Sequence, residues 1–144
     1  MKKSIIKIAG FILLTTLAVS CAVKAEPASM EPVLKLTGAA SASWSEDDLK
    51  ALPVIVAEYT NKDGETTIYT GVAFAELFKA ASVGDFTSLT LVAADGYTVE
   101  VTSDELSGCP TCIVAFQEKD GLNSVMPDFS GKLQVRDLVE IQVN

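Results

Sequence analysis

Apolar and polar residues alternate, or β-branched and aromatic residues cluster, in a series of short segments after residue 32. Such segments, bounded by turn residues, are typical of β-strands. The predicted strands are 33–36, 54–60, 65–70, 89–93, 97–101, 112–117, 122–126, 133–135 and 138–143. The sequences Asn61-Lys62-Asp63-Gly64 and Asp95-Gly96 end in glycine, which adopts the positive φ of tight turns. Each of these two turns predicts a hairpin between the strands that flank it.

The segment 73–82 repeats its apolar residues with the period of a helix instead. Phe74, Leu77, Phe78 and Ala81 follow the spacing i, i+3, i+4 and i+7, which places them on one face of an amphipathic helix. Such a face nearly always belongs to the core, so these side chains are given no cofactor role.

Two further short helices are predicted from their starting residues. Ser45 can cap a helix that Pro53 ends, and a turn at 103–106 ends near Gly108. The acidic pairs Asp47-Asp48 and Asp104-Glu105 lie at these starts, where negative charge complements the helix dipole. We interpret both pairs as capping residues rather than as catalytic carboxylates. The predicted fold is α+β, mostly β with two or three short helices.

The first residues have the pattern of an export signal. Lys2, Lys3 and Lys7 form a positively charged segment. It precedes an apolar run over 8–19 that is too short to span a bilayer comfortably. The next residues offer two processing sites. Leu17-Ala18-Val19-Ser20-Cys21 resembles a bacterial lipoprotein box, which would remove residues 1–20 and lipidate Cys21.

The second processing site is Val23-Lys24-Ala25, an ordinary signal peptidase motif that would extend the signal to residue 25. With the signal ending at residue 20, residues 21–32 are a tether, and residues 33–144 form one domain. The protein is expected to be exported and lipid-anchored to the bacterial membrane, or alternatively to be periplasmic or secreted in soluble form.

Charge and composition exclude several functions. The chain has 19 acidic and 11 basic residues and a net charge of −8, which repels nucleic acid and anionic lipids. We therefore expect no nucleic-acid partner, and membrane contact only through the possible lipid anchor. Histidine is absent, which removes the Ser-His-Asp triad, the Cys-His dyad and histidine-based zinc sites.

The pair Cys109 and Cys112 forms a Cys-Pro-Thr-Cys sequence. A redox-active pair of this kind usually has its first cysteine at the start of a helix, whereas the apolar residues 113–116 predict a strand. Two sulfurs without histidine supply half of a structural zinc site. We therefore predict a structural disulfide and no metal, while a dithiol–disulfide carrier remains the alternative for this pair.

Five stretches, in this order, resemble the molybdopterin-binding domain of the sulfite oxidase family. They are WSEDDLKALP, YTGVAFAELFKAASV, LTLVAADGYTVEV, VMP and LVEIQV. The resemblance extends from about residue 36 to residue 143. It implies the sulfite-oxidase-type fold, and it makes Asp95, Gly96 and Tyr97 the candidate cofactor-binding residues. A structural interpretation of these three is a hairpin turn in which Tyr97 packs on a neighbouring strand.

The sequence lacks the residues that bind the metal and the pterin in this family. The family's molybdenum-binding cysteine would fall within 54–69, and that segment has no cysteine. Histidine contacts to the pterin are absent, the only arginine is Arg136, and 121–125 replaces the usual Gly-x-Pro-x-Arg segment. Since function depends on the site and not on the fold, the resemblance supports the fold and weakens the case for an enzyme.

Three functions follow from the sequence. The first is a non-catalytic exported binding or accessory module at the cell envelope, without a cofactor, whose partner is an unknown protein or small-molecule ligand. The second is a molybdopterin-dependent oxidoreductase or a cofactor or electron-transfer protein. The third is a dithiol–disulfide carrier that uses Cys109 and Cys112.

Overall fold

The structure is a computed structural model that describes residues 31–144. The predicted signal peptide, the lipidation site Cys21 and nearly all of the predicted tether lie outside the described residues. Within them, no helix is both long and apolar enough to cross a membrane.

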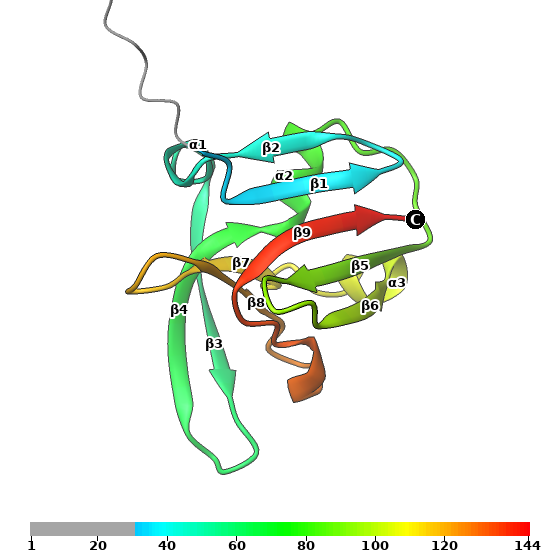
Figure 1. Cartoon of the computed structure of the whole chain (residues 1–144). Helices are drawn as coiled ribbons and strands as arrows, with labels where there is room; N and C mark the ends of the chain where they lie inside the picture. The colour runs from blue at the N-terminus through cyan, green and yellow to red at the C-terminus, as the bar shows by residue number, and fades with distance from the viewer. Residues whose placement is uncertain (1–30) are drawn as a thin grey trace, which may run out of the picture.

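The described chain folds into two sheets with short helices between their strands (Figure 1). The first sheet has the order β2-β1-β9-β5-β6. Its strands are β1 (Leu34–Gly38), β2 (Ala42–Trp44), β5 (Ser88–Ala93), β6 (Thr98–Thr102) and β9 (Leu138–Val143). The second sheet has the order β3-β4-β7-β8. Its strands are β3 (Val54–Thr60), β4 (Thr66–Ala73), β7 (Ile113–Phe116) and β8 (Leu122–Val125). β1 and β9 pair in parallel, and the other paired strands are antiparallel.

Three short α-helices and one 3-10 helix complete the described fold. They are α1 (Glu46–Lys50), α2 (Phe74–Ala80), α3 (Ser103–Ser107) and η1 (Gly131–Leu133). α1 and α3 each begin with a capping box: the hydroxyl of Ser45 or Thr102 accepts a bond from the backbone amide three residues on, and its own backbone amide donates to the carboxylate of Asp48 or Glu105. The predicted α+β class is confirmed, and so is the capping role of these two acids.

One cluster of buried side chains joins the two sheets. It takes Leu36, Leu91 and Ile141 from the first sheet and Val72 and Val114 from the second. α2 contributes Phe74 and Leu77 to the same cluster, as the helical period predicts. A smaller cluster, made of Ala57, Ile113, Ala115 and Val125, lies on the opposite face of the second sheet, because neighbouring residues of a strand point to opposite faces.

One predicted strand is wrong, and one observed strand was not predicted. Leu133 ends η1, and 134–135 continue as irregular chain. Side chains make many of the bonds here: the Gln134 amide exchanges two bonds with the backbone of Met126, and the Ser124 hydroxyl bonds the backbone of Leu133 and Val135. One backbone bond, from the Ser124 amide to the Val135 carbonyl, adds to them. The strand that the sequence missed is β2, which has only 3 residues.

Gly71 sets how closely β4 approaches β7. A Cβ atom at this position would collide with the backbone of Val114 and Ala115. β4 pairs with β7 only over Gly71–Ala73, while its earlier half pairs with β3 alone. The β3–β4 hairpin therefore projects from the body of the molecule (Figure 1).

Candidate functional site

The candidate cofactor-binding residues Asp95, Gly96 and Tyr97 form the turn between β5 and β6. Asp95 Oδ1 accepts a hydrogen bond from the Tyr97 backbone amide at 2.9 Å, and Gly96 has the positive φ that such a turn requires, at 88°. Tyr97 is 45% exposed, and its hydroxyl donates to the Lys132 carbonyl at 3.0 Å. The turn is therefore explained by its own bonds, the Tyr97 hydroxyl contacts η1, and the Tyr97 carbonyl accepts from the amide of Ala93 on β5.

The stretch that would carry the family's molybdenum ligand forms the projecting β3–β4 hairpin. Its exposed side chains include Val54, Val56 and Ile68, and Ile68 lies opposite Glu58 in the strand register. The described residues contain no group of three His, Cys, Asp or Glu side chains placed to hold a metal. A molybdenum centre of this family needs a thiolate, and these side chains do not supply one.

Cys109 and Cys112 form the predicted disulfide. It connects the end of α3 to the start of β7, and both cysteines are buried, at 6% and 1% exposure. The carbonyl of Cys112 also accepts a hydrogen bond from the amide of Phe74 at 3.1 Å. The disulfide thus fixes the position of Cys112, whose carbonyl bonds the amide of Phe74, the first residue of α2.

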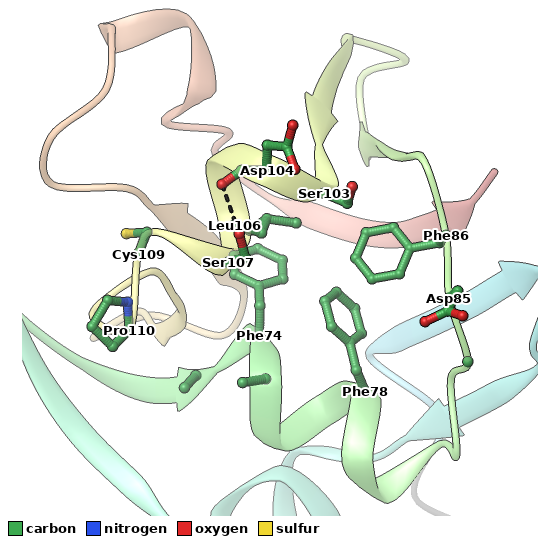
Figure 2. A pocket seen from close by; sticks show the side chains of 13 residues that line it. Phe74, Phe78, Asp85, Phe86, Ser103, Asp104, Leu106, Ser107, Cys109 and Pro110 are labelled. Atoms are coloured by element: carbon green, nitrogen blue, oxygen red, sulfur yellow. Dashed lines mark hydrogen bonds between the residues drawn. The ribbon is translucent and has the colours of Figure 1, made fainter.

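The best-formed pocket lies between α2, the loop at 84–86 and α3, and has a volume of about 460 Å³ (Figure 2). Its wall is mainly apolar and includes three phenylalanines. The ring centroids of Phe74 and Phe78 are 6.1 Å apart, and those of Phe78 and Phe86 are 5.3 Å apart in an edge-to-face arrangement. Leu106 and Pro110 add further apolar surface. We call this site the aromatic pocket.

The polar groups of the aromatic pocket are acidic or neutral. Asp85, Ser103, Asp104 and Ser107 contribute them, and none of the described residues that line the pocket is Lys or Arg. The Ser107 hydroxyl donates to the Asp104 carbonyl at 3.0 Å (Figure 2). Cys109 also lies in the wall, so the disulfide borders the pocket.

Sequence reasoning found part of this pocket but not its use. Phe74 and Phe78 were predicted as core residues; Phe74 is buried as expected, whereas Phe78 is only half-buried. Asp85 and Phe86 were not singled out. The signal in the sequence was the i, i+4 spacing of Phe74 and Phe78, followed by Phe86 in the segment Gly84-Asp85-Phe86.

Two other hollows are less suited to a specific ligand. One, of about 540 Å³, lies beside Lys35, Asp120 and Asp137. The other, of about 520 Å³, runs between β4 and the segment 116–119. Neither is walled by stacked aromatic rings, and none of the three hollows is lined by Asp95, Gly96 or Tyr97.

Comparison with known proteins places the fold but not the family. No protein-family model matches the chain, and no curated protein matches it. Among solved structures, the sulfane dehydrogenase SoxCD from Paracoccus pantotrophus is similar, with a TM-score of 0.65 and 14% sequence identity. The match covers 76% of this chain and 37% of that chain. It shows that the domain has a fold related to part of that dehydrogenase, and membership of the sulfite oxidase family stays a prediction.

Proposed function

We propose that this protein is an exported, non-catalytic binding module that holds a small organic molecule in the aromatic pocket. The observation that carries the proposal is the pocket itself, whose volume of about 460 Å³ falls in the range of small-molecule sites. Apolar walls with a few polar groups are also typical of such sites.

The chemistry of the side chains favours binding over catalysis. A general base near neutral pH is usually histidine, and the chain has none. The cysteine that borders the pocket is bonded to Cys112 and is not a free thiolate nucleophile. The remaining polar groups of the pocket, two carboxylates and two hydroxyls, can orient a ligand.

A neutral bicyclic probe, 2-(1-naphthyl)ethanol, tests whether the pocket binds. In an NMR titration of the isotope-labelled protein, we expect the largest amide shifts at Phe78, Phe86 and Leu106. Ala75 is exposed on α2 at the pocket wall, so Ala75→Leu should fill the pocket and weaken binding at least fivefold. Ala80→Leu, at an exposed position of the same helix outside the wall, is the matched control. Equal binding by both variants would contradict the proposal.

We propose further that no molybdopterin is held. The protein should be purified from a host that makes the molybdenum cofactor, and its bound molybdenum and released pterin measured. We expect neither. Stoichiometric molybdenum would favour an oxidoreductase instead, and pterin without metal would favour a cofactor carrier.

The proposed location is a bacterial membrane, to which the exported protein is anchored through a lipidated Cys21. Labelling with an alkyne-tagged fatty acid tests this directly. We expect label and membrane fractionation for the natural sequence, and loss of both for Cys21→Ser. Label-free protein in the soluble fraction would favour cleavage after Ala25.

A further inference from the structure

We infer that the aromatic pocket selects organic cations, that is, ligands with an apolar ring or chain and a protonated amine. This inference rests on the proposed function, since it names the ligand class of the same pocket. It is carried by the combination of aromatic rings and carboxylates around one pocket, and by neither feature alone.

The charges around the pocket favour a cation. Asp85 on the loop at 84–86 and Asp104 on α3 both line it, and the two segments lie on different sides of the aromatic rings (Figure 2). No Lys or Arg among the described lining residues offsets them. An anionic ligand would meet two carboxylates and no positive partner, whereas an ammonium group gains from both.

The aromatic rings favour the same ligand. A cation within about 6 Å of a ring centroid is attracted to the face of the ring. Phe78 and Phe86 both line the pocket and meet edge to face, so their ring faces point in different directions. Phenylalanine rings bind neutral apolar groups as well. The preference for a cation therefore requires the carboxylates of Asp85 and Asp104 in addition to the rings.

One hydroxyl can complete the recognition of an ammonium group. Ser103 is half-buried in the wall, and its side chain lies between Asp104 and Phe86 in the close view (Figure 2). A hydroxyl oxygen accepts hydrogen bonds, and an ammonium group has up to three protons to donate. Ser103 thus gives an amine a partner that an alkyl group cannot use.

Three probes with the same ring system test the inference: 2-(1-naphthyl)ethylamine, 2-(1-naphthyl)ethanol and 1-naphthylacetate. Their dissociation constants are measured by NMR titration of the full exported protein at pH 7 and low salt. We expect the amine to bind at least tenfold more tightly than the alcohol, and the acetate to bind most weakly. The advantage of the amine should shrink at 0.5 M salt, because salt screens exposed charges.

The double variant Asp85→Asn, Asp104→Asn should remove the amine's advantage, so that amine and alcohol bind with affinities within about twofold of each other. Asp63→Asn, Asp128→Asn is the matched control, since it makes the same change of net charge at exposed positions outside the pocket. Equal affinity for amine and alcohol in the natural protein would overturn the cation preference and leave the proposed binding function intact. Absence of pocket shifts with all three probes would overturn both.

Discussion

The hydroxyl of Ser124 donates to the carbonyl of Leu133 at 2.6 Å and accepts from the amide of Val135 at 2.8 Å. Ser124 lies on β8 and is 1% exposed. One side chain thereby satisfies two backbone groups, one at the end of η1 and one just after it. The position of residues 133–135 beside β8 depends on that hydroxyl.

Ser124→Ala should destabilise the protein by about 2 kcal/mol, because it leaves a buried carbonyl and a buried amide without these partners. Urea denaturation measures the change in the free energy of unfolding. Ser43→Ala is the control, since Ser43 is exposed on β2, and it should change stability by less than about 0.5 kcal/mol. Equal stability of the two variants would show that the two bonds contribute nothing net.

The same residues explain why 133–135 was predicted as a strand. Leu133 and Val135 are buried on either side of the half-buried Gln134, which is the alternation expected of a strand. Periodicity reports which side chains are buried, but not which groups bond the backbone. Here the side chains of Ser124 and Gln134 make four of the bonds, and a single backbone bond joins Ser124 to Val135 in place of a strand ladder. A single sequence gives no sign of that pairing.

The disulfide and the hairpins could be predicted because the residues that make them are neighbours in the chain. Cys109 and Cys112 are separated by 3 positions, and each hairpin turn carries its own glycine. The aromatic pocket could not be predicted in the same way. Phe86 and Pro110 reach it from segments far apart in sequence from each other, and only the folded chain brings them to α2.

Gly71→Ala should destabilise the protein by about 3 kcal/mol, because overpacking against a rigid backbone forces strands apart. The added Cβ atom would meet the backbone of Val114 and Ala115 rather than a flexible side chain. Gly108→Ala is the control, since its Cβ would make only ordinary contacts with backbone carbonyls. This prediction also gives the glycine of the Tyr-Thr-Gly-Val motif a structural reason that involves no cofactor. A Gly71→Ala variant as stable as Gly108→Ala would contradict it.

Asp48 makes the stability of α1 depend on pH. Hydrogen bonds from the side chain and the backbone of Ser45 hold the pKa of its carboxyl below the usual value of 3.8. A lowered pKa in the folded state stabilises the protein above the usual pKa, and this contribution is lost as pH falls through the folded-state value.

Asp48→Asn should therefore lower the urea midpoint at pH 7, and the difference from the natural protein should shrink below about pH 4. Asp47→Asn is the control, because Asp47 lies in the same first turn but Asp48 makes the bonds to Ser45. A pH-independent difference for Asp48→Asn would mean that its charge is not what caps the helix.

The burial of the disulfide predicts that it is a structural bond. Cys109 and Cys112 are almost inaccessible to an attacking thiol, and exchange requires such an attack. Inaccessibility slows exchange, and structural disulfides also typically have reduction potentials below about −300 mV. Equilibration with glutathione and with dithiothreitol, followed by alkylation of free thiols, should give a potential in that range. A potential in the range of known oxidoreductases, about −270 to −120 mV, would favour the dithiol–disulfide carrier.

The paired variant Cys109→Ser, Cys112→Ser separates the stability of the fold from the shape of the pocket. The enclosed loop is short, so its loss should cost about 2 kcal/mol in chain entropy and leave the protein folded. Because Cys109 borders the aromatic pocket and Cys112 holds the amide of Phe74, naphthyl probes should bind several-fold more weakly. Ser124→Ala, which lies outside the pocket, is the control with a similar loss of stability and unchanged probe affinity. Equal affinities for both variants would mean that the disulfide stabilises the fold without shaping the pocket.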